Sequence, residues 1–513
     1  MRDRKGIRLW PLGLLLALAA SGTGLTWVAG LGRQRQDRVL YTGMIMIVTI
    51  LAAFLWFLLF SRLRWRTRLT GLLLVVILGV AVRYTVRVEA VSGDLVPNFR
   101  WVWSQPRDAK LAEPETGTIA AESRAGTSEH DFPGYLGAGA DGIVDGVRLA
   151  RDWAANPPRE VWRREIGSGW SGFAVAGDFA ITQEQRGSEE RTTCHDLASG
   201  EILWSHAEAV RHEEPLGGPG PRATPAISGE RVFSLGATGI LNALDLRSGE
   251  SLWRVDLTEV AGVGRPEYGF AASPVVHDGR VVVVAGGNAG RSLWAFDEFT
   301  GEVVWSGGNA PYGYATPVVG TLAGREQWVA LSEGSVNGIA ADDGTLLWSQ
   351  AWPQPTEETA QPKLLPGDRV LVSSGYGVGA KMYRLRASDN GIDVETLWES
   401  IRLKAKFSDF VILDEHAYGL DDGILTAVSL ADGSRAWKKG RYGHGQLLLV
   451  GNLLLILAED GSVALVEARP DAYVEHGRIE VLEGKTWNHP ALSGSSLLVR
   501  NAREVVLLEL ALE

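Results

Sequence analysis

The order of hydrophobic and polar positions divides the chain into an apolar front and a long region of short alternating runs. Three almost uninterrupted apolar runs occupy residues 11–32, 41–60 and 69–86. Beyond residue 130, short runs of β-branched and apolar residues alternate with turns that contain Gly, Asp and Ser. Apolar runs of about 20 residues predict membrane-spanning helices, whereas short alternating runs predict strands. The pattern therefore predicts three transmembrane helices followed by an all-β domain.

One phrase recurs through the β region: a turn with Gly, two or three mixed residues, and a tryptophan. It reads "SGESLWRVDL" at 248–257 and returns as "TGEVVWSGGN", "DGTLLWSQAW" and "DGSRAWKKGR". The tryptophans that align are spaced 39–52 residues apart: Trp162, Trp204, Trp253, Trp305, Trp348, Trp398, Trp437 and Trp487. A four-stranded propeller blade repeats about every 40–50 residues. We therefore predict an eight-bladed β-propeller over residues 131–513; an array of β-sandwiches with chance Trp spacing is the alternative.

A single repeat shows how such a blade is built. In residues 272–307, "RVVVVAG" suits a strand buried on both faces, "SLWAFD" alternates, and "EVVW" returns after the turn "EFTG". Gly301 can supply a positive φ for this turn, and Asp297 can bond to nearby backbone amides. The large ring of Trp305 can then fill the wedge between neighbouring blades.

The charges that flank the apolar runs predict their orientation. Eight Lys and Arg lie before the first run and between the second and third, against five in the other two flanks. Positively charged flanks stay in the cytoplasm, so we expect the N-terminus inside and the propeller outside. A first run cleaved as a signal peptide would leave this result unchanged. If residues 69–82 were instead a short buried helix, the propeller would lie in the cytoplasm.

Composition excludes some function classes. The net charge of −11 is the sum of +10 in residues 1–105 and −21 in the remainder. An acidic propeller is a poor partner for nucleic acid, because contacts to phosphates require a basic surface. Cys194 is the one cysteine, so no internal disulfide is possible. Residues 88–130 are polar and without an apolar period, which predicts a flexible tether.

The repeats resemble those of the pyrroloquinoline-quinone-like (PQQ-like) β-propeller superfamily. "GPGPRATPAISGERVFSLGATGILNALD" (218–245), "GLDDGILTAVSLADG" (419–433) and "RYGHGQLLLVGNLLLILAEDG" (441–461) are similar to a membrane-anchored, BamB-like branch. The superfamily contains quinoprotein alcohol dehydrogenases and envelope-assembly propellers. The resemblance covers about residues 131–510 and is specific for the fold, while one propeller scaffold hosts many functions.

Enzyme chemistry finds little support in the residues. The resemblance implies, for a dehydrogenase, a quinone stacked on a tryptophan, a calcium ion and a catalytic aspartate, often beneath a disulfide of adjacent cysteines. No such cysteine pair, C-x-x-C-H haem motif or assignable calcium set is present. We interpret Asp421–Asp422 and Asp342–Asp343 as turn formers, and the glycine-rich stretch 375–383 as a loop. The sequence assigns no catalytic residue and no metal ligand.

Polar and aromatic residues recur just before the innermost strand of each blade, where side chains converge on the axis of a propeller. We hypothesise that they form an axial pocket for a ligand or peptide. Its candidates are Trp170, Gln183, Glu184, Arg222, Thr224, Tyr268, Tyr312, Tyr314, Lys406, Tyr442, His444, Trp487 and Asn488. The alternative is that these residues form hydrogen-bonded seams and wedges between blades.

The sequence favours a binding or scaffolding module over an enzyme. We expect a multi-pass protein of the inner (cytoplasmic) membrane whose propeller faces the periplasm and binds envelope proteins or peptides. The alternative is a PQQ-dependent dehydrogenase that oxidises an alcohol or sugar and requires PQQ with calcium; otherwise no cofactor is expected. A sensor is a third class, but the short cytoplasmic segments offer no output domain.

Overall fold

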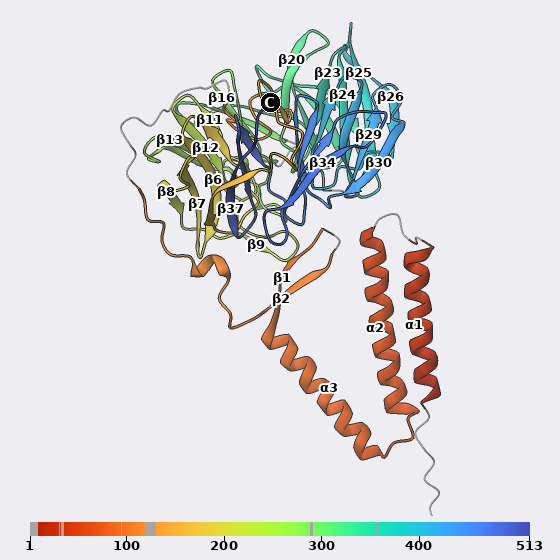
Figure 1. The fold of residues 1–513 in the computed structure, drawn as a ribbon. Helices are drawn as coiled ribbons and strands as arrows, with labels where there is room; N and C mark the ends of the chain where they lie inside the picture. Colours follow the sequence, from red (N-terminus) through yellow and green to blue (C-terminus); the bar gives the residue numbers. More distant parts are fainter. Residues whose placement is uncertain are drawn as a thin grey trace, which may run out of the picture. The chain divides into compact units, whose positions relative to one another are not determined.

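A computed structural model of the chain describes residues 9–29, 31, 35–93, 95–117, 130–287, 291–353 and 357–513. It separates into two compact units. The first comprises Met1–Gln105 and Pro215–Gly218, and the second comprises Pro106–Glu214 and Pro219–Glu513. The first unit contains helices and one β-ribbon, and the second is the propeller (Figure 1).

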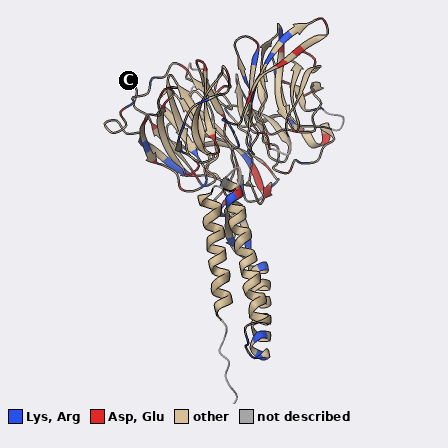
Figure 2. Ribbon diagram, turned by 90° about the vertical axis from the view of Figure 1, so that its right-hand side faces the viewer, with Lys and Arg blue, Asp and Glu red and all other residues tan. Residues whose placement is uncertain are grey.

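Three apolar helices open the chain: α1 (Trp10–Val28), α2 (Arg35–Leu59) and α3 (Trp65–Thr85). Each is long and apolar enough to span a membrane. The third has 21 residues, because its helix begins four residues before the apolar run at 69 and continues past residue 82. Figure 2 shows the helices free of charge over most of their length, with Lys and Arg near their ends.

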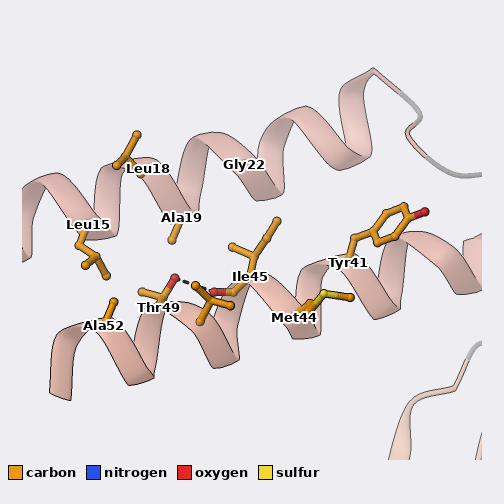
Figure 3. Close-up of a pocket in the computed structure, with 10 residues that line it drawn as sticks. Leu15, Leu18, Ala19, Gly22, Tyr41, Met44, Ile45, Thr49 and Ala52 are labelled. Carbon is orange, nitrogen blue, oxygen red and sulfur yellow. Dashed lines mark hydrogen bonds between the residues drawn. The ribbon is translucent and has the colours of Figure 1, made fainter. Parts of the chain in front are cut away.

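Helices α1 and α2 lie side by side (Figure 3). Small residues at Ala19 and Gly22 allow a close approach, and a Cβ on Gly22 would lie 3.5 Å from Cδ1 of Ile45. The Trp27 Nε1 donates a hydrogen bond to Thr42 Oγ1 at 3.0 Å. An apolar groove of about 450 Å³ follows the seam between the two helices.

The predicted tether contains regular structure. Directly after α3 the chain forms an antiparallel ribbon of β1 (Val86–Val91) and β2 (Pro97–Trp101), followed by the 3₁₀ helix η1 (Arg107–Lys110). The ribbon forms because β-branched and aromatic residues alternate with polar ones here. Within the propeller unit, Asp108 is buried and pairs with Arg211 at 2.6 Å. Residues 118–129 of the tether lie outside the described residues.

The propeller has eight antiparallel blades, as predicted. Blades 1 to 4 contain β5 (Ala174–Ala176), β6 (Phe179–Arg186), β7 (Glu189–Asp196), β8 (Ile202–Glu208); β11 (Ala226–Ser228), β12 (Arg231–Leu235), β13 (Ile240–Asp245), β14 (Ser251–Asp256); β15 (Val275–His277), β16 (Arg280–Val284), β17 (Leu293–Asp297), β18 (Val303–Gly307); and β19 (Val318–Leu322), β20 (Arg325–Ser332), β21 (Ser335–Ala340), β22 (Leu346–Ala351).

Blades 5 to 8 complete the ring. They contain β23 (Lys363–Leu365), β24 (Arg369–Ser374), β25 (Gly379–Ser388), β26 (Gly391–Ser400); β27 (Phe410–Leu413), β28 (His416–Asp421), β29 (Ile424–Ser429), β30 (Arg435–Arg441); β31 (Gln446–Val450), β32 (Leu453–Leu457), β33 (Ser462–Glu467), β34 (Glu475–Glu480); and β35 (Ala491–Ser493), β36 (Ser496–Arg500), β37 (Glu504–Glu509) with β4 (Arg159–Glu165). Short β9 (Glu213–Glu214), β10 (Gly218–Pro219) and helix α4 (Leu257–Ala261) lie in connections.

The ring closes through segments that are distant in the sequence. β4 pairs with β37 and forms the outer strand of blade 8, and β3 (Ile143–Val144) adds a parallel fifth strand beside β31 in blade 7. First strands of neighbouring blades touch at several boundaries, as β11 does with β5 and β15, and β35 touches β5. The N-terminal part of the propeller therefore holds its C-terminal blades.

Seven of the aligned tryptophans occupy one position, on the outer strand just after a β-bulge. For five of them a glycine in a turn of the next blade lies under the ring: Trp162 on Gly200, Trp204 on Gly249, Trp253 on Gly301, Trp305 on Gly344 and Trp398 on Gly433. The contact is close, because a Cβ on Gly249 would lie 2.5 Å from Trp204. Trp204 Nε1 also donates to the Leu246 carbonyl at 2.9 Å. The repeated phrase thus encodes the contact between blades.

Trp487 requires a correction, because it does not belong to this set. It lies in the loop before β35, and the equivalent outer-strand position of blade 7 is Gly477. Trp153, from the segment before β4, covers this glycine: a Cβ on Gly477 would lie 2.8 Å from the Trp153 Cβ. A tryptophan from elsewhere in the chain thus occupies the place of the tryptophan that blade 7 lacks.

Candidate functional site

The loops that precede the first strands carry most of the predicted site residues. Because these strands are innermost and run in the same direction, the residues ahead of them gather at one end of the ring. Side chains from these loops and from the β24–β25 turn form a connected layer, which we call the mouth layer. It consists of Trp170, Arg222, Tyr268, Tyr312, Tyr314, Tyr376, Lys406, Phe407, His444, Lys485 and Trp487.

Five rings from five different blades form one half of the mouth layer. Trp170 and Trp487 have ring centroids 5.2 Å apart, and Trp487 lies 5.0 Å from Phe407. Phe407 in turn contacts His444 at 5.5 Å and Tyr376 at 6.3 Å. All but His444 are partly exposed. The blades thus contribute to a single aromatic surface that no single repeat contains.

Two lysines lie over this aromatic half. Lys485 Nζ is 4.0 Å from the ring centroid of Trp487 and 4.6 Å from that of Trp170. Burial lowers the pKa of Lys485 to about 8, although the carboxylate of Glu459 opposes the shift. Cation–π contacts of this kind stabilise a charge that has lost part of its hydration.

Lys406 is positioned by the turn between β24 and β25. Its Nζ lies 4.8 Å from the ring centroid of Tyr376 and 5.0 Å from that of Phe407. A Cβ on Gly375 would lie 2.7 Å from the Lys406 side chain, so a glycine is needed there. Tyr376 adopts φ +55°, which is uncommon for a bulky residue. The predicted loop at 375–383 is therefore a turn only over residues 375–378, because Gly379 begins β25. The conformation of this turn places an aromatic ring over a lysine.

Tyrosines form the other half of the mouth layer. Tyr314 lies 5.0 Å from Tyr312 and 5.6 Å from Tyr268, measured between ring centroids. Burial raises the pKa of all three, and raises that of Tyr314 to about 12. The charge of Glu357 acts on Tyr268, Tyr314 and Tyr376, and therefore connects the two halves.

Arg222 is the remaining cation of the mouth layer. Its side chain is largely buried, and this burial lowers the pKa of Arg222, while the carboxylates of Glu214 and Glu190 oppose the shift. Its Nη2 lies 3.3 Å from Glu214 Oε1. Burial likewise raises the pKa of Glu190 to about 7. The mouth layer thus combines aromatic faces with cations, and carboxylates lie beside it; aromatic residues and Arg are enriched in protein interfaces.

Four of the predicted pocket residues form seams between blades. Gln183 Nε2 donates to the Ala223 carbonyl at 2.7 Å, and the Thr224 hydroxyl accepts from Gly172 N at 3.1 Å. Asn488 Nδ2 donates to the Ser171 carbonyl at 2.8 Å. Glu184 is buried, accepts from the backbone amide of Gly167 and pairs with Arg186 at 2.7 Å.

Tyr442 also lies outside the mouth layer. Its hydroxyl is hydrogen-bonded to the Tyr473 hydroxyl at 2.8 Å and to the Glu475 carboxylate on the outer strand β34. Its ring packs with Val411 and Leu449 in the core between blades 6 and 7. It therefore acts as a wedge, because its side chain runs outward between two blades.

The segment before β3 crosses the channel below the mouth layer. Phe132 bridges to Val175 of β5, and the Pro133 carbonyl accepts from Ile227 of β11. Across the ring, the Gly142 carbonyl accepts from Leu449 of β31. A chain that bonds to the first strands of blades 1, 2 and 7 must pass through the channel. We call residues 131–144 the plug, and it closes one end of the ring.

A buried polar group joins the plug to the blades. Tyr135 donates to Asp409 Oδ2 at 3.1 Å, and Lys363 Nζ lies 3.4 Å from Asp409 Oδ1 and 3.2 Å from the Asp141 carbonyl. Burial lowers the pKa of His489, whose ring lies 4.6 Å from that of Tyr135, to about 4. This group stabilises the plug in the channel.

The sequence did not predict several of these residues. Tyr376, Phe407, Lys485 and Glu357 lie in loops, outside the repeated phrase, and the plug looked like a lead-in to the first blade. The glycines of "PGYLGAGADG" were the available signal for the plug: a Cβ on Gly134 would lie 3.7 Å from the Ala226 Cα and from the Pro225 carbonyl oxygen, so the plug backbone packs against blade 2 here.

No group of three His, Cys, Asp or Glu side chains in the described part of the chain is arranged to hold a metal ion. Asp343 accepts from Thr345 N at 2.9 Å, as a turn former does. Asp421 differs: it is fully buried and pairs with Lys438 at 2.6 Å, with Arg435 at 3.1 Å, and with Lys404. Its role is an ion-pair network within blade 6.

Known proteins share this architecture and these repeats. Residues 188–439 match the family model described as "Outer membrane protein assembly factor BamB". The propeller is PQQ-like. Proteins named outer membrane protein assembly factor BamB are similar in sequence: that of Yersinia pestis is 24% identical over 250 residues, 47% of this chain and 62% of that protein. That of Shewanella oneidensis is 23% identical over 60% of this chain and 76% of that protein.

Solved structures share the fold of the PQQ-like propeller. BamB from Moraxella catarrhalis matches with a TM-score of 0.50 and 16% identity, over 69% of this chain and 97% of that one. A quinohaemoprotein alcohol dehydrogenase from Comamonas testosteroni matches with a TM-score of 0.52 and 11% identity, over 76% and 81%. The chain spans less than two thirds of the Yersinia relative, and these identities show the fold alone.

Proposed function

We propose that this chain is a membrane-anchored PQQ-like propeller that presents its mouth layer to a protein partner of the cell envelope. The observation that carries the proposal is the mouth layer: partly exposed rings from different blades, with cations beside them, above a channel closed by the plug. Tyr, Trp and Arg dominate the energetics of protein interfaces, because large rigid rings bury area at low entropic cost.

Anchoring and orientation form part of the proposal. Three apolar helices, and the excess of Lys and Arg before the first helix and between the second and third, favour a multi-pass inner-membrane protein with its propeller in the periplasm. The relatives named as outer membrane assembly factors support an envelope partner. The protein's role is then to hold that partner near the membrane, and no catalytic step is assigned to the mouth layer.

Site-specific photo-crosslinking in cells tests the proposal. A photoreactive phenylalanine at Tyr314 should give a crosslinked partner, and one at Asn390, in the exposed β25–β26 turn, should not. Trp487→Ala should reduce the Tyr314 crosslink at least severalfold without lowering the melting temperature by more than a few degrees. Equal crosslinking from both sites, or none from Tyr314 in a folded protein, would overturn the binding role.

The same cells test the orientation. If the propeller lies in the periplasm, Asn390→Cys should react with a membrane-impermeant maleimide before the inner membrane is opened. Cys194 should not contribute to the labelling, because it is buried and burial raises the pKa of its thiol. Labelling that requires lysis of the inner membrane would place the propeller in the cytoplasm.

A PQQ-dependent dehydrogenase is the second candidate, favoured by the fold shared with the quinohaemoprotein and by the Trp170–Trp487 pair. Calorimetric titration of the full chain with PQQ, with and without calcium, distinguishes the two functions. Saturation near one equivalent would favour the dehydrogenase, and the absence of heat and of thermal shift would favour a cofactor-free binding module.

A further inference from the structure

The ribbon of β1 and β2 has two different faces. Val86 lies directly opposite Trp101, and Val88 directly opposite Phe99, so these four residues share one face. The intervening pair shares the other face and joins Arg87 to Arg100. Alternation along both strands therefore produces an apolar face and a cationic face.

The apolar face is exposed. The side chains of Phe99 and Trp101 are 63% and 54% accessible, and Trp103, which stacks on Trp101 with centroids 5.1 Å apart, is 67% accessible. A two-stranded ribbon by itself is marginally stable in water, and it needs its apolar face covered. The exposed aromatics indicate that another apolar surface covers this face.

The position of the ribbon in the chain indicates which surface that is. β1 begins at Val86, the residue after the last residue of α3. A helix of 21 residues rises about 31 Å, the thickness of the hydrocarbon core of a bilayer. Where α3 spans, Thr85 lies at the boundary of that core. The ribbon then starts at the depth where Trp and Tyr are enriched in membrane proteins.

Charge agrees with this position. Arg83, Arg87 and Arg100 outnumber Glu89 and Asp94 in the segment. Arg100 lies directly opposite Arg87 and donates from Nη1 to the Ser104 carbonyl at 3.0 Å, and like charges paired across two strands are destabilising. Phosphate oxygens of lipid headgroups would relieve this repulsion, because arginine binds phosphate with paired N–H donors.

We propose that the β1–β2 ribbon lies in the headgroup region of the bilayer, with Val86, Val88, Phe99 and Trp101 toward the acyl chains and Arg87 and Arg100 toward lipid phosphates. This inference rests on the anchoring by α3 in the proposed function. The ribbon is then a membrane-seated base at which the chain leaves the bilayer, rather than a free tether.

Depth-dependent fluorescence quenching in the full chain tests this position. The protein is reconstituted in vesicles of phosphatidylethanolamine and phosphatidylglycerol, and Val88→Cys carries a small fluorophore. Lipids spin-labelled near the headgroup end of the acyl chain should quench at least half of its emission. Leu74→Cys, in the middle of α3, should be quenched best by a label deep in the chain, and Asn390→Cys should lose less than a tenth.

The controls separate the possible failures. Quenching at Leu74 without quenching at Val88 would overturn the position of the ribbon while the anchor stands. No quenching at Leu74 would overturn the anchor, and the inference with it. If the labelled protein is not quenched and the unlabelled Val88→Cys variant forms disulfide-linked dimers, a second copy of the chain covers this face and the position in the bilayer is wrong. Trp101→Asp should reduce quenching at Val88 at least twofold, because a carboxylate opposes burial of the ribbon.

Discussion

At the residue scale, the mouth layer holds ionisable groups whose burial works against their charge. Lys485 is the clearest case: two indole rings cover it, Glu459 is near, and burial nevertheless lowers its pKa to about 8. A cation held at that energetic cost is available to a partner that supplies an anion, because the partner would replace the lost hydration. Charge in this layer therefore opposes stability of the free protein.

Replacing Lys485 with methionine should reveal this cost. Between pH 8 and about 10.4 the folded protein has lost the Lys485 proton that the unfolded chain still binds, so the free energy of unfolding of the natural protein rises with pH there. The free energy of unfolding of Lys485→Met lacks this dependence on pH, because methionine does not titrate. The natural protein should therefore be less stable than the variant at pH 7, by up to about 3 kcal/mol, and should match it near pH 10.5. Urea unfolding at both pH values measures the difference, and a pH-independent difference would contradict the shift.

At the scale of the elements, the blades are held together by one repeated contact. At most boundaries a tryptophan on the outer strand packs on a turn glycine of the next blade. In Trp204 and Trp398 the Nε1 also donates to a carbonyl of that blade, that of Leu246 and that of Leu430. The contact requires two things of the glycine: a positive φ and no Cβ. Blade 7 lacks the tryptophan, and Trp153 supplies the missing ring.

Gly249→Ala separates these two requirements when compared with Gly229→Ala. Both glycines have positive φ, +71° and +54°, but a Cβ on Gly229 would meet nothing within 4 Å. Gly229→Ala should cost about 1 kcal/mol for its backbone conformation. Gly249→Ala should cost at least about 2 kcal/mol more, because the new methyl group collides with the Trp204 ring.

The double variant provides the control. In a Trp204→Ala background the collision is gone, so Gly249→Ala should then cost no more than Gly229→Ala. Chemical unfolding of the four variants completes the cycle. If Gly249→Ala were equally costly with and without Trp204, the ring would not be what restricts this position.

At the scale of the whole molecule, the ring depends on residues that close it from its two ends. β4 completes blade 8, and Arg500, fully buried at the end of β36 in the same blade, joins blade 8 to blade 1. Its Nη1 donates to the Gln183 carbonyl at 2.9 Å and its Nη2 to the Gly167 carbonyl at 3.0 Å. Burial lowers the pKa of Arg500 to about 10, and the charge of Glu184 opposes the shift.

Arg500→Met should therefore destabilise the propeller by about 3–5 kcal/mol, because it leaves buried carbonyls unpaired and removes the charge opposite Glu184. Arg503→Met is the matched control: its side chain is exposed on the same hairpin, and its loss should change stability by less than about 0.5 kcal/mol. Thermal and urea unfolding measure both variants. Similar effects of the two substitutions would show that Arg500 does not hold the closure.

The sequence by itself determined the three apolar helices and the eight-bladed fold. Both follow from local patterns: an apolar run long enough for a bilayer, and a phrase of turn, glycine and tryptophan that recurs at most boundaries between blades. It also determined that the loops before the innermost strands carry rings and charges such as Trp170, Tyr314 and Lys406. A contact that recurs from blade to blade requires the same residues at a regular spacing, and this spacing can be recognised in a single sequence.

Only the tertiary structure decided what happens once in the molecule. Trp153 covers Gly477, β4 closes blade 8, and the plug fills the channel; each joins segments distant in sequence, so no period marks it. The same holds for the candidate site. Gln183 and Asn488 face the seams, whereas Lys485 and Phe407 face the mouth layer, because the direction of a loop side chain depends on contacts between blades that local sequence does not encode.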